Sequence, residues 1–150
     1  MRSLRQGSGR SQLSLGAVKE ETRVSIRSDQ DILKAREQGR ALAQRLGMSN
    51  TNLTVVATVI SELARNILLY AKRGELVLGF VERNGQQGLA VTARDRGPGI
   101  ADIDSALRVG FSTSGSLGLG LPGVRRLMDD FDIVSSLGEG TTVTATKWKN

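Results

Sequence analysis

The residues with the clearest chemical potential lie in one glycine-rich segment, residues 95–123. It reads DRGPGIADIDSALRVGFSTSGSLGLGLPG, with glycine at positions 97, 99, 110, 115, 118, 120 and 123. So many glycines cost backbone entropy on folding, and close approach of a ligand to the main chain is the usual compensation. Backbone N–H groups in such a loop can bind phosphate oxygens. The segment therefore predicts a nucleotide pocket.

Asp95 opens this segment directly after the alternating run LAVTAR, so it is expected at the end of a strand. A carboxylate there can accept a hydrogen bond from a purine amino group, and Gly97 and Gly99 would let the base come close. After Gly120 the sequence becomes helical, with Pro122 in the first turn. Free N–H groups and the positive end of the helix dipole would favour phosphate at that helix start.

Two other interpretations of the glycines are open. Gly118, Gly120 and Gly123 spell GxGxxG, and Glu139 follows, as in a dinucleotide-binding fingerprint. That fingerprint needs a preceding strand and a following parallel βα unit, whereas FSTSGSL is a poor strand and little chain remains. The other alternative is a mobile Gly/Ser loop without a ligand. The nucleotide pocket is favoured over both.

A carboxylate and an amide stand one turn apart on a helix predicted from after Ser49 to about Ala71. Glu62 and Asn66 share a face with apolar residues, while a second apolar face makes the helix covered on most sides. Polar groups in such a surface are costly unless something uses them. The alternative is a partly exposed polar pair, or one answered by a neighbour such as Arg65.

Composition narrows the function classes. The 150 residues fit one domain and contain no cysteine and no histidine, which removes thiol, disulfide and imidazole chemistry and leaves carboxylates as the obvious bases. No apolar run is expected to approach the length of a membrane span, and the N-terminus lacks the apolar core of a signal peptide, so a cytoplasmic protein without membrane contact is predicted. The net charge of +6 comes with one Trp and one Tyr, too few aromatics for base stacking, so no nucleic-acid partner is expected.

The rest of the chain supplies the elements that must position these groups. Residues 1–19 predict a disordered basic tail, and residues 20–150 predict one domain. Within the domain we expect strands at 21–27, 75–83, 89–94, 133–137 and 141–148, the second and third joined by a hairpin at Asn84-Gly85. A capping-box pattern at Ser28 and Asp31 opens a first helix that ends at Gly47. Further helices are expected from after Ser49 to about 71, at about 103–109 and after 120. This order predicts an α/β two-layer sandwich, with helices on one face of a mixed, mostly antiparallel sheet.

Four stretches together resemble the ATP-binding GHKL superfamily. SELARNILLYA (61–71) resembles its N box, DRGPGI (95–100) its first glycine box, GFSTSGSLGLGLPGVRRLMDDF (110–131) its lid and second glycine box, and GEGTTVTA (138–145) its closing strand. Within the superfamily, the sequences of these motifs are most similar to those of the short bacterial serine kinases of partner-switching systems, which include the stressosome switch kinases. The lack of histidine fits, because a two-component histidine kinase would need its phospho-acceptor helix.

The resemblance implies ATP and Mg²⁺ as cofactors and a role for each matching residue. Asn66 would hold the Mg²⁺ that bridges the ATP phosphates, and Glu62 would be the general base for an incoming serine hydroxyl. Asp95 would recognise the adenine amino group, helped by Gly99 and Thr141. The residues that would close over the phosphates as a lid are Ser112, Thr113, Ser114, Gly118 and Gly120.

The implied activity is that of an ATP-dependent protein serine/threonine kinase. It would phosphorylate a STAS-domain partner and thereby switch a stress-response or sigma-factor pathway. Two alternatives remain: an anti-sigma factor of the same fold, or a docking module that activates a phosphatase or other output enzyme.

Overall fold

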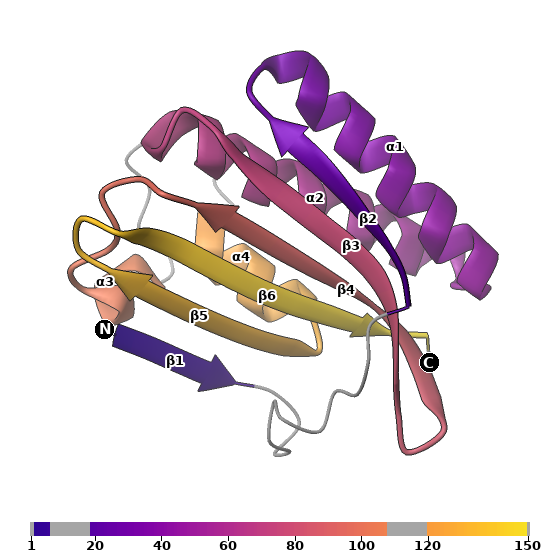
Figure 1. Ribbon diagram of the computed structural model, residues 1–150. Helices are drawn as coiled ribbons and strands as arrows, with labels where there is room; N and C mark the ends of the chain where they lie inside the picture. The colour runs from indigo at the N-terminus through magenta and orange to yellow at the C-terminus, as the bar shows by residue number, and fades with distance from the viewer. Residues whose placement is uncertain (1, 7–18, 108–119, 150) are drawn as a thin grey trace.

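The computed structural model describes residues 2–6, 19–107 and 120–149. The helices are α1 (Asp29–Leu46), α2 (Asn50–Tyr70), α3 (Ile103–Ala106) and α4 (Gly120–Leu127). The strands are β1 (Arg2–Gln6), β2 (Lys19–Ile26), β3 (Gly74–Arg83), β4 (Gln86–Asp95), β5 (Asp130–Ser136) and β6 (Gly140–Trp148). They form one sheet in the order β1-β5-β6-β4-β3-β2, and α1, α2 and α4 cover one face of it (Figure 1).

The predicted α/β sandwich is confirmed, with one difference in strand direction. All neighbouring pairs among the described strands are antiparallel, where a mixed sheet was expected. The connections explain this. Helices α1 and α2 run out and back, so β3 starts near the end of β2 and must return beside it, while β4 and β6 each follow their predecessor through a tight turn.

Local capping determines where the first two helices begin. The backbone N–H groups of Ser28 and Arg27 donate to Asp31 Oδ2 at 3.1 and 2.8 Å, which confirms the predicted capping box. Helix α1 ends at Gly47, whose φ of 89° is the left-handed conformation that glycine adopts without strain. Helix α2 is capped by the side chain of Ser49.

The connection between β3 and β4 is the predicted hairpin. Asn84 and Gly85 both have positive φ, 53° and 78°. Positive φ at both central residues is what a type I′ turn requires, and Asn-Gly is the pair that adopts it most readily.

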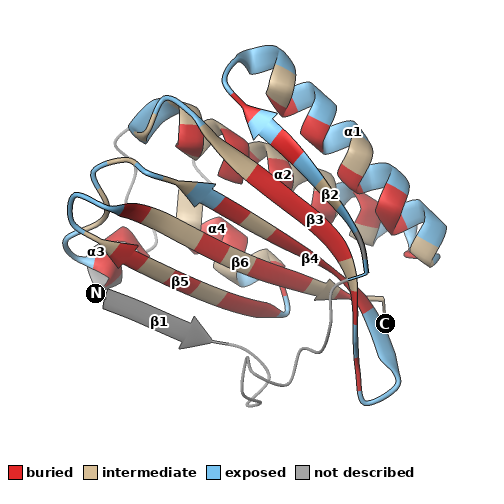
Figure 2. Ribbon diagram, in the orientation of Figure 1, coloured by how far each residue is buried: buried red, intermediate tan, exposed pale blue. Residues whose placement is uncertain are grey.

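The main core lies between the helices and the sheet. Figure 2 shows buried positions running along the central strands β3 and β4 and following the inner sides of the helices. Helix α2 is central: the apolar members of its buried face are Leu53, Val56, Val59, Ile60, Leu63, Ala64 and Ile67. By length and composition alone α2 could cross a membrane, which corrects the expectation that no apolar run comes near that length. In this fold the same apolar residues belong to the core cluster.

The N-terminal residues differ from the sequence-based expectation. A disordered tail was predicted for residues 1–19, but Arg2–Gln6 form β1 and pair with β5 in antiparallel register, Arg2 opposite Ser135 and Gln6 opposite Phe131. The segment RSLRQ has a single apolar residue and therefore no strand periodicity. Its strand is made by main-chain pairing with the edge of β5, which side-chain pattern does not reveal. Residues 7–18 lie outside the described part of the chain.

Candidate functional site

Three polar side chains form a row across the end of the sheet. Asp95 is the last residue of β4 and lies opposite Thr141 of β6, which in turn lies opposite Ser135 of β5. Residues directly opposite in an antiparallel pair share a face, and each of these three stands two positions from a buried core residue of its own strand. The row therefore lies on the helix-covered face, where the apolar core ends.

Asp95 is half-buried and held by its own loop. Its Oδ1 accepts a hydrogen bond from the backbone N–H of Gly97 at 2.8 Å. Its Oδ2 has no hydrogen bond to any residue that the structure describes. One oxygen thus orients the carboxylate while the other remains able to accept, as the recognition of an amino group requires.

The glycines after Asp95 permit close packing within the protein. A Cβ on Gly97 would stand 2.7 Å from the Cβ of Ala71, at the end of α2. A Cβ on Gly99, whose φ is 79°, would meet the carbonyl oxygen of Ser136. The missing side chains of these glycines therefore leave room for the end of α2 and for the β5–β6 turn. The sequence did not predict this reason for the glycines. Their contact with a base stays a prediction.

Glu62 is buried and only partly paired. Its side chain is 4% exposed, and Oε1 accepts from Arg65 Nη1 at 3.1 Å. Its Oε2 is buried with no hydrogen-bond partner among the described residues. Asn66, one turn further along α2, is half-buried. Arg65 thus pairs with Oε1, as the alternative interpretation allowed. It does not pair with Oε2, which is the atom that a reactant could use.

The end of α2 lies beside the end of β4. Gly74 pairs with Asp95 in the sheet, and a Cβ at Gly74 would meet the side chain of Ile67. Together with the contact between Gly97 and Ala71, this brings the turn of α2 that follows Asn66 against the strand end that carries Asp95. Residues some thirty positions apart are therefore assembled by the packing of one helix on the sheet.

Most of the predicted lid falls outside the described residues. This applies to Ser112, Thr113, Ser114 and Gly118. Gly120 is described: it is the first residue of α4, with φ of 52°. Helix α4 buries Pro122, Gly123 and Val124 and packs against α2, so its start is connected to the helix that carries Glu62 and Asn66.

The donor set fits a metal that also binds phosphate. Within residues 2–6, 19–107 and 120–149 no three acidic side chains gather into a metal cage. The amide oxygen of Asn66 is a hard donor suited to Mg²⁺, which commonly takes few ligands from protein and the rest from phosphates and water. The residues therefore fit a magnesium–nucleotide complex better than a metal bound by protein alone.

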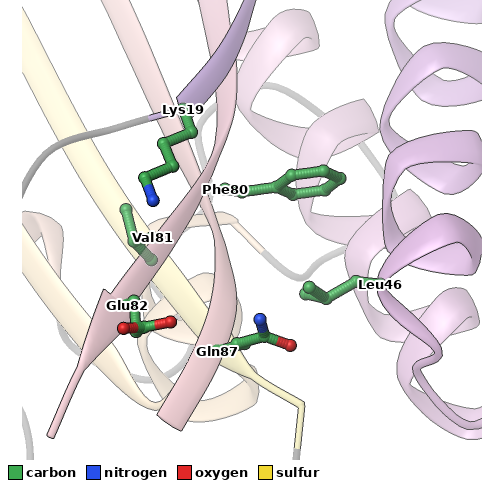
Figure 3. A pocket seen from close by; sticks show the side chains of 6 residues that line it. All are labelled: Lys19, Leu46, Phe80, Val81, Glu82 and Gln87. Carbon is green, nitrogen blue, oxygen red and sulfur yellow. The ribbon is translucent and has the colours of Figure 1, made fainter. Parts of the chain in front are cut away.

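A hollow elsewhere in the fold does not compete for this role. It lies at the opposite ends of β3 and β4 from Asp95, and Lys19, Leu46, Phe80, Val81, Glu82 and Gln87 line it (Figure 3). Its volume of about 110 Å³ is small against the roughly 300 Å³ or more of typical ligand pockets.

Ser135 is the site residue that the sequence analysis missed. It is 1% exposed, and its Oγ accepts from the backbone N–H of Ile100, in the first glycine box, at 2.7 Å. A signal was available, since Ser135 has the same alternation as the buried Ile133 of its strand. A small polar residue at an inward-facing strand position points to a hydrogen bond within the protein.

Comparison with known proteins agrees with this geometry. Residues 27–147 match the family described as the histidine kinase-like ATPase domain. The chain is 50% identical over 125 residues to the serine/threonine-protein kinase RsbT of Bacillus subtilis (strain 168), covering 83% of this chain and 94% of that protein. It is also 32% identical over 130 residues to the anti-sigma F factor of Geobacillus thermodenitrificans (strain NG80-2), covering 82% and 87% respectively.

The resemblance inferred from the four sequence boxes is thereby confirmed, and the matching family is an ATPase family and not a dinucleotide-binding one. The match covers both layers of the sandwich and all the elements that carry Glu62, Asn66, Asp95 and Thr141. This chain belongs to the histidine kinase-like ATPase domain family.

Proposed function

We propose that the protein is an ATP-dependent protein serine/threonine kinase of a partner-switching system. The observation that carries the proposal is the buried Oε2 of Glu62, which has no hydrogen-bond partner among the described residues. Glu62 lies one turn from Asn66, on the helix whose end abuts the Asp95 loop. The family membership and the 50% identity to a protein named as a serine/threonine kinase support it.

Each polar group then has a task in phosphoryl transfer. Asp95 and Thr141 would bind the adenine, and Asn66 would hold Mg²⁺, which neutralises charge on the phosphates. Glu62 Oε2 would accept the proton of the substrate's serine or threonine hydroxyl while that hydroxyl oxygen bonds to the γ-phosphorus. The bond from that phosphorus to the β–γ bridging oxygen breaks, and its electrons leave with ADP.

The acceptor we propose is a STAS-domain protein, and its phosphorylation would switch a stress-response or sigma-factor pathway. Relatives named as a kinase and as anti-sigma factors support a role in exchanging protein partners. We place this exchange in the cytoplasm, where ATP is plentiful and a chain without cysteine needs no oxidising compartment.

The test is phosphoryl transfer to a purified STAS partner. With Mg-ATP we expect the partner to gain the mass of one phosphate, and Glu62→Gln and Asn66→Ala to reduce that gain strongly. Glu37→Gln, an exposed carboxylate on α1, is the matched control and should transfer normally. Full transfer by both site variants would contradict the assigned roles, and no transfer by the wild-type protein would contradict the kinase.

An anti-sigma factor is the second candidate, because the 32% identity to one covers most of both chains. In that case a sigma factor should co-purify with the protein, and binding should survive in Glu62→Gln. A docking module for an output enzyme makes a third prediction: stimulation of that enzyme that depends on neither Glu62 nor Asn66.

A further inference from the structure

We propose that Ser135 is a positioning residue that sets base specificity by orienting the hydroxyl of Thr141. The inference rests on the proposed function only in taking Asp95 and Thr141 as the base-binding pair. It concerns a buried side chain whose hydroxyl makes three polar contacts with described residues at the end of the sheet.

The three contacts determine where the hydrogens lie. Ser135 Oγ is 2.7 Å from the backbone nitrogen of Ile100, 3.2 Å from the carbonyl oxygen of Gly140 and 2.9 Å from Thr141 Oγ1. The backbone nitrogen of Ile100 can only donate, and the carbonyl oxygen of Gly140 can only accept. Ser135 Oγ therefore accepts from Ile100 and donates its single hydrogen to Gly140. The contact with Thr141 is then satisfied only if Thr141 is the donor.

This arrangement leaves Thr141 with lone pairs and no hydrogen for a ligand. Its neighbour across the β4–β6 ladder, Asp95, is also an acceptor through Oδ2. Two acceptors side by side favour a donor group and disfavour a carbonyl. The amino group at position 6 of adenine has two hydrogens and can donate to both acceptors, whereas the oxygen at position 6 of hypoxanthine and guanine only accepts and leaves N1–H as the neighbouring donor. The row should therefore favour ATP over ITP and GTP.

Ser135 also holds the loop on which Asp95 depends. The bond from Ile100 connects the first glycine box to Ser135 of β5, and the bond to Gly140 connects the same serine to the turn before Thr141. Gly140 is confined in any case, because its φ is 117° and a Cβ there would meet the carbonyl oxygen of Asp95. The serine therefore links the two halves of the base site through one buried oxygen.

The test measures equilibrium binding of ATP and ITP to wild type, Ser135→Ala, Thr141→Val and the double variant. We expect wild type to prefer ATP. Ser135→Ala should lower the ATP:ITP affinity ratio by about fivefold or more, because the freed Thr141 hydroxyl can turn and donate to the oxygen of ITP. In the Thr141→Val background, Ser135→Ala should change the ratio much less, since no hydroxyl remains to be oriented and only the support of the glycine box is lost.

Thr146→Val is the matched control. Thr146 is also 1% exposed and lies on β6, but its hydroxyl has no hydrogen-bond partner among the described residues. Its removal should leave the ratio unchanged. Ser135→Cys keeps the side-chain volume with a weak donor and acceptor, and should give an intermediate ratio. Thermal melting without nucleotide checks that each variant is folded.

The outcomes separate this inference from the proposed function. An unaltered ATP:ITP ratio in folded Ser135→Ala and Ser135→Cys overturns the role of Ser135 while leaving the kinase intact. An equal change of the ratio with and without the Thr141 hydroxyl overturns it as well, because the effect would not pass through Thr141. Failure of the wild-type protein to bind ATP overturns both proposals.

Discussion

Glu62 makes a structural contact and also has a chemical role in the function we propose. One carboxylate oxygen is bonded to Arg65, and the other is buried without a described partner. A protein optimised for stability alone would pair both oxygens or replace the carboxylate. Retaining a partly satisfied charge on a core helix is typical of a functional site, where stability is lost for the sake of chemistry.

The first prediction follows from this conflict between stability and chemistry at Glu62. Glu62→Gln should leave the free energy of unfolding unchanged or raise it, because a buried charge is removed from a site that satisfies it only in part. Phosphoryl transfer should fall by about a hundredfold or more, since an amide cannot act as a base. Chemical denaturation and a transfer assay on the same preparation check the two effects. A variant that loses stability and activity together would contradict the separation.

The second prediction concerns Arg65. Arg65→Gln should lower the free energy of unfolding by about 1–2 kcal/mol, a value discounted because the arginine side chain is 34% exposed. The same change made in the Glu62→Gln background should cost much less, because no carboxylate is left unpaired. Arg36→Gln, at an exposed position of α1, is the control and should change the stability little. Equal losses in both backgrounds would mean that Arg65 acts through something other than Glu62.

At the scale of elements, the contact between α1 and α2 positions the helix that carries the site. Gly39 is buried in α1, where a Cβ would meet the Cδ1 atom of Ile60 in α2. The absent side chain lets the two helices approach closely, and Ile60 fills the space. Displacing α2 at this point would shift Glu62, which lies only two residues further along.

The third prediction tests this close approach. Gly39→Ala should destabilise the protein by about 1–3 kcal/mol despite the better helix propensity of alanine, because the new methyl group overlaps Ile60. Ile60→Val removes the Cδ1 atom that would clash, so Gly39→Ala/Ile60→Val should be more stable than the sum of the two single changes predicts. Thermal or urea unfolding of the four proteins gives the coupling. Additive effects would place the strain elsewhere.

At the scale of the whole molecule, a buried polar cluster of Asp130, Arg83 and Trp148 connects strands at the end of the sheet away from the site. Asp130 Oδ2 accepts from Arg83 Nη2 at 3.0 Å and from Trp148 Nε1 at 2.9 Å, and the guanidinium lies over the indole ring at 4.7 Å. All three side chains are buried. They come from β5, β3 and β6, so one carboxylate connects strands across the width of the sheet.

The fourth prediction is a loss of stability without a change in nucleotide binding. Asp130→Leu should cost about 3–5 kcal/mol, because the buried guanidinium of Arg83 loses this carboxylate, and adding Arg83→Met should recover part of the loss. ATP affinity of the folded protein should be unaffected, since the cluster is at the far end of the strands from Asp95. Glu75→Gln, which breaks the exposed pair with Arg23, is the control and should cost under about 1 kcal/mol. A changed ATP affinity in folded Asp130→Leu would show that the two ends are coupled.

Local patterns in the sequence were enough to predict most elements of this fold. The Ser28 capping box, the Asn84-Gly85 hairpin and the placement of Asp95 at a strand end are each decided by a few adjacent residues. Backbone conformation and short-range hydrogen bonds control such features, so sequence alone predicts them well. Spacing on one helix likewise placed Glu62 and Asn66 one turn apart.

Only the tertiary structure decided which of these groups meet. Register between β4, β5 and β6 aligns Asp95, Thr141 and Ser135, and no local pattern specifies register between strands so far apart in the chain. Strand β1 was missed for a related reason: its partner is the edge of β5, reached across more than a hundred residues, and its own sequence has no alternation. The sequence by itself determined most of the elements and which residue types they carry, because these depend on neighbours along the chain. The assembly of the site depended on packing and register, which exist only once the whole chain has folded.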